Sequence, residues 1–438
     1  MAWVFGAVWM FIITGAALTQ FAKQLGMSQF GFGVLAALPF AGQLFQLPVS
    51  YIIERYGYRK PLFVWLGVLH RVLWLALAAV PWLTASRDAW RSVIVVVGFS
   101  WVAGQMIGPA WVSWMADLVP SRIRGRYFSR RAQVGQAVGL VASLVTGLLL
   151  DQAVRHGVEI LLKTSSVIIA VAAVCGIVDF LFFLWVGDPP SRPPDPNLNW
   201  RELVRAPLAD KNFRRFLWFG GTLTFGIAFI NQFICLYLIE VHNFSNTAVN
   251  AMVVLTTLAV YALASPLWGR LLDRFGRKPV LILSVLLIVH GAAAWIFVGR
   301  EHWLVPFLVI TIATAAWPGM ELGTFNTLLS LTTAARENSS DRCSHVVVYS
   351  AVTAFSGIVS GVVGGLIAQA LRDWHGTFLG QPLTHHGVLF LMASAARLVS
   401  LAFLVRFHDP GAATTRETLR SISAEFFENI PWPTRPKK

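Results

Sequence analysis

Glu321 is the side chain whose position points most directly to chemistry, because it lies inside a long apolar segment. It follows Trp317-Pro318-Gly319-Met320, and this proline and glycine predict an interruption of the helix. A carboxyl group in poorly solvated surroundings can carry a proton or hold a cation. The alternative is a carboxylic acid that hydrogen-bonds to a neighbouring helix. We favour a functional role, as a proton-coupling or substrate-contacting group.

Uncharged polar side chains in the apolar segments could recognise a solute. Amides donate and accept hydrogen bonds without carrying charge. With tryptophans nearby, such a set suits a neutral or weakly charged organic molecule. Each amide alone is equally well explained as a hydrogen bond between helices. The set consists of Thr14, Gln20, Gln105, Asn231, Gln232 and Asn326, with Trp101, Trp111 and Trp317 nearby.

The composition indicates a polytopic membrane protein. The chain is 56% hydrophobic and 13% charged, whereas about 25% of the residues in a soluble domain are charged. Backbone polar groups in lipid must be satisfied within the segment, so long apolar segments predict helices. We expect no cleavable signal peptide, because Met1 is followed almost at once by a full-length apolar segment. Cys175, Cys235 and Cys343 show no metal-binding or disulfide spacing, and we expect them to fill space.

The apolar segments predict twelve spans, and the basic residues orient them. Of the 35 Lys and Arg residues, 26 fall in loops on the side of the N-terminus, seven fall in the opposite loops and two lie in spans. This asymmetry predicts that both termini are cytoplasmic, in an inner (plasma) membrane. The net charge of +14 is then a topogenic signal that also attracts membrane lipid. The predicted spans are 3–22, 30–53, 61–83, 92–116, 131–152, 162–187, 213–239, 247–271, 279–299, 303–331, 344–371 and 385–407.

The hydrophilic segments divide the chain. A proline-rich stretch with an amphipathic pattern follows the sixth span and predicts a cytoplasmic linker carrying a surface helix. The end of the chain is polar, and a surface helix and a frayed tail are equally good interpretations. The predicted parts are an N-terminal six-helix bundle (1–187), the linker (188–212), a C-terminal six-helix bundle (213–408) and a cytoplasmic tail (409–438).

A short charged loop occurs twice, half a chain apart. The downstream copy, residues 269–278, reads GRLLDRFGRK, and the upstream copy, residues 50–60, reads SYIIERYGYRK. Gly57 and Gly276 are 219 positions apart in a chain of 438, which indicates an internal duplication. The downstream copy resembles the signature loop of the major facilitator superfamily, G-x-L-a-D-r-x-G-r-k. The upstream copy departs from it, with serine for the first glycine, glutamate for the aspartate and tyrosine for one basic residue.

This resemblance, which covers nearly the whole chain, implies an all-α fold of twelve transmembrane helices in two pseudo-symmetric six-helix bundles. It also implies that spans one, four, seven and ten line a central cavity, and the polar set above lies on these four spans. Spans three and six would lie outside the cavity, so we expect Arg71 and Asp179 to form a structural ion pair. No partner is evident for Arg397.

The resemblance further implies that the two loops act as a gate. The glycines permit a positive φ at the turn. The acid of each loop would bind the N-terminus of a helix in the other half, where free amides favour an anion. Glu54 would meet span eleven near Ser344, and Asp273 would meet span five near Ser129. Alternatively these charges are only topogenic. The gating residues are Glu54, Arg55, Gly57, Arg59, Asp273, Arg274, Gly276 and Arg277.

The predicted function is secondary active transport of a small organic solute by alternating access, with proton coupling as an option. We find no nucleotide-binding loop, catalytic motif, metal site or nucleic-acid-binding pattern, so we expect a monomeric non-enzyme without cofactors. Span four lacks the arginine pattern, and span five the glycine–proline pattern, of many drug–proton antiporters. The alternatives are a non-transporting scaffold or assembly factor on the same fold, which a cavity filled by bulky apolar side chains would favour, and a passive uniporter.

Overall fold

The computed structural model describes most of the chain. The residues described are 2–56, 58–83, 89–189, 205, 207–231, 233–299, 301–334, 341–409 and 417. Most of the predicted linker and almost all of the predicted tail lie outside them, as do Gly57, Gln232 and the side chains of Glu54, Arg55 and Cys343. The predicted domain boundaries therefore stay predictions. Below, "N-terminal half" means residues 2–189 and "C-terminal half" means residues 207–409.

The described residues contain eleven helical stretches long and apolar enough to cross a membrane, or twelve if a bent pair forms one span. In the N-terminal half the helices are α1 (Ala2–Ile13), α2 (Ala16–Gln24), α3 (Gln29–Gln43), α4 (Gln46–Tyr56), α5 (Arg59–Leu83), α6 (Ala89–Leu118), α7 (Ser121–Arg155), α8 (Val158–Leu181) and η1 (Phe182–Trp185). In the C-terminal half they are α10 (Lys211–Ala228), α11 (Phe233–Glu240), α12 (Asn246–Asn250), η2 (Ala251–Leu255), α13 (Thr256–Phe275), α14 (Arg277–Ala294), η3 (Trp295–Phe297), α15 (Leu304–Ala315), α16 (Trp317–Ala334), α17 (Asp341–Ala370) and α18 (His385–Val405).

Each predicted span thus corresponds to one helix or to two or three consecutive helical pieces, and the all-helical prediction is confirmed. The structure adds one feature, a short antiparallel hairpin of β1 (Gly376–Phe378) and β2 (Gln381–Leu383). Its two-residue turn places Leu379 and Gly380 at positive φ, as a tight hairpin requires. The sequence before it contains no alternation of apolar and polar residues that is long enough to predict a strand.

Three of the spans expected to line a cavity are interrupted near their middles. The first bends by 48° between α1 and α2. The seventh is broken between α10 and α11, and the tenth at Ala316, between α15 and α16. The last break lies just before Pro318, because proline lacks an amide N–H and ends the hydrogen-bond ladder of the preceding turn. The predicted interruption of span ten is therefore confirmed. Broken helices free backbone groups for binding inside a bundle.

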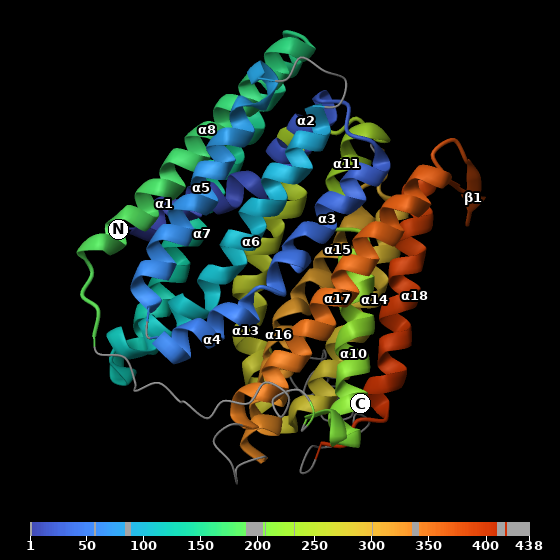
Figure 1. Ribbon diagram of the computed structural model, residues 1–438. Helices are drawn as coiled ribbons and strands as arrows, with labels where there is room; N and C mark the ends of the chain where they lie inside the picture. Colours follow the sequence, from blue (N-terminus) through green and yellow to red (C-terminus); the bar gives the residue numbers. More distant parts are fainter. Residues whose placement is uncertain are drawn as a thin grey trace, which may run out of the picture.

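We name the two ends of the molecule by their loops. The signature face is where α4 leads to α5 and α13 leads to α14, and the distal face is the opposite end, where α2 ends and α12 begins (Figure 1). The largest contact between the halves is that of α3 with α17. Glycines permit it: a Cβ at Gly361 would lie 2.7 Å from the carbonyl oxygen of Gly33, and a Cβ at Gly365 would lie 2.9 Å from that of Phe30. The contact does not extend along α4, which packs mainly on α6 of its own half.

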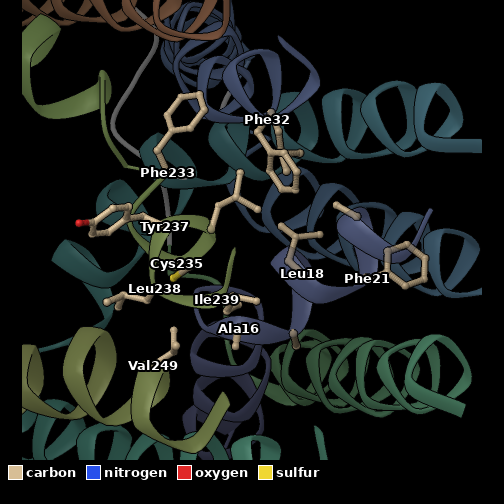
Figure 2. Packing of buried hydrophobic residues seen from close by; sticks show 14 of the residues in the cluster. Ala16, Leu18, Phe21, Phe32, Phe233, Cys235, Tyr237, Leu238, Ile239 and Val249 are labelled. Carbon is tan, nitrogen blue, oxygen red and sulfur yellow. The ribbon is translucent and has the colours of Figure 1, made fainter. Parts of the chain in front are cut away.

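The buried apolar residues also differ between the two ends of the molecule. On the distal side one continuous cluster spans both halves, and Figure 2 shows part of it, with Leu18 and Phe32 on one side of the view and Phe233 and Leu238 on the other. Buried Cys235 belongs to this layer. On the signature side the core is divided into one cluster in each half. Burial of apolar surface therefore joins the halves at the distal face and stabilises them separately at the signature face.

Candidate functional site

A cavity of about 410 Å³ lies between α1 and the C-terminal half, and it brings together four of the predicted substrate-binding residues. These are Thr14, Asn231, Trp317 and Glu321. We call it the C-terminal cavity. Thr14 and Asn231 lie in the breaks of the first and seventh spans, and Trp317 begins α16. Each break therefore brings a predicted residue into the same space, which separate sequence segments could not reveal.

Glu321 has a partner that the sequence did not single out. The hydroxyl of Tyr261, on α13, donates a hydrogen bond to Glu321 Oε2 at 2.5 Å. Glu321 is otherwise exposed to the cavity. A carboxyl group with one fixed donor and one open side can exchange a proton or contact a solute. The signal for Tyr261 was a tyrosine inside an apolar span, which is weak by itself.

Arg397, for which the sequence suggested no partner, lines the same cavity. Its Nη1 donates to the carbonyl oxygen of Ile288 at 3.2 Å, while Nε has no hydrogen-bond partner among the described residues. The side chain is buried, so it does not snorkel to an interface.

A second cavity, of about 350 Å³, lies within the N-terminal half, and we call it the N-terminal cavity. Gln105, Trp101 and Trp111 line it, as do Arg71 and Asp179. Gln105 accepts a hydrogen bond from Gln46 Nε2 at 2.8 Å. The predicted residues that line cavities are therefore divided between two of them, one at the boundary of the halves and one within the N-terminal half.

The predicted ion pair of Arg71 with Asp179 does not form as a direct contact among the described side chains. The Arg71 guanidinium instead stacks on Trp9, with Cζ 3.3 Å from the ring centroid. Asp179 lies against Gly6 of α1, where a Cβ would collide with its carboxylate. Arg71 and Asp179 therefore share the N-terminal cavity without the direct ion pair that the sequence predicted.

The remaining members of the predicted polar set lie elsewhere. Gln20 is buried at the distal face, and its Nε2 donates to Asn246 Oδ1 at 2.7 Å. Asn326 donates to the carbonyl oxygen of Leu322 in its own helix. Gln232 lies outside the described residues. For Gln20 the competing interpretation, a hydrogen bond between helices, describes the observed contact, whereas the contact of Asn326 lies within its own helix.

The distal face holds a polar junction between the halves that the sequence analysis missed. Asp151, at the end of α7, accepts from the backbone N–H groups of Asn246 and Thr247 at 2.6 and 3.0 Å. The same carboxylate accepts from Asn246 Nδ2 and Thr247 Oγ1 at 3.0 and 2.6 Å. An anion from one half thus binds the first turn of the eighth span in the other half. Its only sequence signal was an acid at the end of a span.

Asn250 extends this junction to the break in the first span. Its Oδ1 accepts from the backbone N–H of Ala16 at 2.8 Å, and its Nδ2 donates to the carbonyl oxygen of Ser143 at 2.9 Å. Helix α2 has no side-chain cap of its own at Gly15. A residue of the C-terminal half therefore satisfies a helix end in the N-terminal half. At the rim, Glu240 accepts from Gln29 Nε2 at 3.3 Å and pairs with Lys23 at 3.6 Å.

Four basic residues of the signature loops, Arg59, Lys60, Arg277 and Lys278, make contacts within their own halves. Arg59, buried at the start of α5, pairs with Asp117 and Asp188, and Lys60 donates to the carbonyl oxygen of Val186 at 2.7 Å. The downstream loop repeats this arrangement. There Arg277 pairs with Asp409, and Lys278 donates to the carbonyl oxygen of Val405 at 2.8 Å. In each half, the loop ties the start of the third helix of the repeat to the end of the sixth.

The acidic residues of these loops were predicted to bridge the halves. Asp273 is exposed and has no hydrogen bond or ion pair with the described residues, and Arg274 is also exposed. The side chains of Glu54 and Arg55, and Gly57 as a whole, lie outside the described residues. Gly276 has a φ of +89°, the conformation that the turn was expected to need.

The arrangement of the helices is also found in solved structures of transporters. The chain resembles the crystal structures of the nucleoside transporter NupG (TM-score 0.67, 16% identity, covering 93% of this chain and 97% of that one) and of a D-xylose–proton symporter (0.65, 15%, 94% and 98%). It also resembles a bacterial homologue of the human lysosomal transporter Spinster, solved in an inward-facing and unoccupied conformation (0.62, 15%, 99% and 97%). At these identities the similarity shows the fold alone.

A search of curated protein sequences gave no match. A sequence model of the Major Facilitator Superfamily, in contrast, matches residues 1–260 and again residues 217–432. The two matches together span nearly the whole chain, and they agree with the signature loops and with the twelve-span architecture. The chain is therefore a multi-pass, non-enzymatic membrane protein that belongs to the major facilitator superfamily of transporters.

Proposed function

We propose that the protein is a secondary active transporter that moves a small organic solute across the membrane by alternating access. The observation that carries this proposal is the C-terminal cavity, in which the polar groups of Thr14, Asn231, Trp317 and Glu321 converge near helix breaks within a largely apolar lining. A scaffold on the same fold would have no need for this space, and bulky apolar side chains would fill it. The polar junction between the halves lies at the distal face, which also supports a protein that alternates between two closures.

We propose further that Glu321 couples transport to protons, with Tyr261 as the donor that fixes one carboxylate oxygen. A solute that reaches the cavity would then exchange contacts with the free side of this carboxyl group. A passive uniporter would use the same cavity without needing a titrating group.

The test begins with a thermal-shift screen of the purified protein against sugars, amino acids, nucleosides, organic acids and drugs at two pH values. A ligand of the folded state raises its apparent stability by mass action. A hit is then measured for uptake into proteoliposomes with and without a pH gradient. Glu321→Gln should abolish proton-driven accumulation but retain solute exchange, whereas Glu159→Gln, at an exposed site paired with Lys163, should change neither.

Two results would contradict the proposal at different levels. If Glu321→Gln leaves the pH dependence of uptake unchanged, Glu321 is not the coupling site. If neither the screen nor counterflow reveals any solute, the scaffold interpretation gains and the search moves to protein partners.

We also propose that the signature face is cytoplasmic, in an inner (plasma) membrane, and that the protein is a monomer. The excess of Lys and Arg in the loops on that side supports this orientation. Reporter fusions at the C-terminus and at the hairpin turn near Leu379 should report opposite sides of the membrane. Equal reporter activity at both positions would contradict this orientation.

A further inference from the structure

The lining of the N-terminal cavity carries more positive than negative charge. Among its described lining residues are two arginines, Arg71 and Arg131, and one carboxylate, Asp179. Asp179 interacts electrostatically with both guanidinium groups, so it compensates one positive charge and leaves the other. The C-terminal cavity, in contrast, contains one arginine and one glutamate among its lining residues. An uncompensated charge inside a membrane bundle is costly and indicates a function.

Arg71 carries hydrogen-bond donors that nothing in the described structure satisfies. The side chain is only 6% exposed, and its Nε and Nη1 have no hydrogen-bond partner among the described residues. The neighbouring Trp9 covers one face of the guanidinium but offers no acceptor in its plane. Leaving buried donors without an acceptor destabilises the folded protein. The site therefore lacks an acceptor, and a bound anion would supply one.

Arg131 is held in the same manner. Its guanidinium Cζ lies 3.8 Å from the ring centroid of Trp3 and 5.0 Å from that of Trp111. Stacking on the faces of a guanidinium leaves its N–H groups free in the plane, where they match the two oxygens of a carboxylate. Both arginines are thus oriented by indole rings before any ligand binds, which lowers the entropy cost of binding.

We propose that the N-terminal cavity binds the carboxylate of a monoanionic organic solute, with Arg71 and Arg131 as its ligands. One negative charge balances the charge that Asp179 leaves uncompensated. The indole rings of Trp101 and Trp111, which also line the cavity, offer flat apolar surface for the body of the solute. At about 350 Å³ the cavity accommodates a small aromatic or similarly flat acid.

This inference rests on the proposed function in one respect only, namely that the bound anion is transported. Binding itself is independent of transport, so the first experiment measures binding at equilibrium. Isothermal titration calorimetry on the detergent-purified full chain uses three carboxylates and their amides as probes. The probes are acetate, benzoate and indole-3-acetate, with acetamide, benzamide and indole-3-acetamide; benzylamine tests the opposite charge.

At least one carboxylate should bind about tenfold or more tightly than its amide, because the amide cannot satisfy the charged donors. Arg131→Gln and Arg71→Gln should each weaken that carboxylate by about tenfold or more. Arg71→Lys retains the charge without the planar fork, and its effect should be intermediate. The matched control is Arg155→Gln, which removes an exposed arginine from the last turn of α7, the helix that carries Arg131, and should leave carboxylate binding unchanged. Size-exclusion profiles identify any variant that does not fold.

Two outcomes would overturn the inference. One is that no carboxylate binds better than its amide. The other is that carboxylate affinity survives both Arg131→Gln and Arg71→Lys in folded protein. If a carboxylate binds through the arginines but no proteoliposome takes it up, the anion site stands and the transport function fails. If another solute is transported and no carboxylate binds, transport stands and the anion site fails.

Discussion

Two acidic residues at opposite ends of the molecule make the most instructive comparison. Asp151, at the distal face, accepts four hydrogen bonds from the first turn of a helix in the other half. Asp273, at the signature face, was predicted to make the same kind of contact but is exposed and unpaired among the described residues. Among the described residues, Asp151 thus forms the interaction of an anion with a helix N-terminus at the distal face, and Asp273 does not form it at the signature face.

The difference shows which side of the molecule is closed. At the distal face the halves share a continuous apolar cluster, a glycine contact and the Asp151 junction. At the signature face each half has its own cluster and its own basic anchors. Alternating access needs two closures of which one is broken at a time. We infer that the distal closure is the one formed here, and that Asp273 belongs to the other closure.

The largest expected effect concerns the anchors, which should stabilise each half without joining the two. Arg59→Gln leaves Asp117 and Asp188 without their buried partner and should destabilise the protein by about 3 kcal/mol. Arg277→Gln is the matched change in the other half. Thermal unfolding in detergent measures the loss.

Double electron–electron resonance tests whether these anchors act across the halves. Spin labels at Val154→Cys and Leu379→Cys, both exposed at the distal face, report the separation there in a background without native cysteines. We expect an unchanged distance in Arg59→Gln. A widened distance would show that the anchor also holds the halves together.

The glycine contact should be the next most sensitive element. Gly33→Ala places a methyl group 2.5 Å from the carbonyl oxygen of Gly361, so α3 and α17 must separate, at a cost of about 2 kcal/mol. Gly269→Ala is the control, because a Cβ there meets nothing within 4 Å and alanine favours the helix. We expect the labelled distal distance to widen only in Gly33→Ala. Equal distances in the two variants would contradict a distal closure by α3 and α17.

The two acids can be compared directly. Asp151→Ala removes four hydrogen bonds to a charged acceptor and should weaken the distal closure by about 1–2 kcal/mol. Asp273→Ala should change stability by less than about 0.5 kcal/mol in this conformation, since its side chain is exposed. The same labels and thermal unfolding measure both. Similar losses in the two variants would mean that the signature face is also closed in solution.

The smallest effect is a pH dependence at the distal face. Burial lowers the pKa of His242, which packs edge-on against Tyr237 in the loop before α12. The folded state therefore favours the neutral ring, while the unfolded chain takes up a proton near pH 6.5. Stability should fall as the pH drops below about 6.5. His242→Gln should lose less stability between pH 7 and pH 5 than the parent protein, and an identical loss would exclude His242 as a source.

Much of the architecture followed from the sequence. Long apolar segments must be helices in lipid because their backbone groups have no other partners, so the twelve spans and the break before Pro318 were predictable. The repeated charged loop indicated the superfamily because turn geometry and topogenic charge are local properties. Glu321, Thr14 and Asn231 were predicted because each is a polar residue in an apolar span, where a polar group indicates a hydrogen bond or a binding role.

The tertiary structure decided which polar groups meet. Asp151 binds Asn246 and Thr247 across 95 and 96 positions of sequence, and Arg71 stacks on Trp9 instead of pairing with Asp179. Such contacts depend on how two halves dock and on where glycines let helices approach, and hydropathy encodes neither. The sequence by itself determined the helices, their number and the family. Only the packed structure decided which end is closed and which charges remain free, because both depend on free-energy differences between docked arrangements of the same helices.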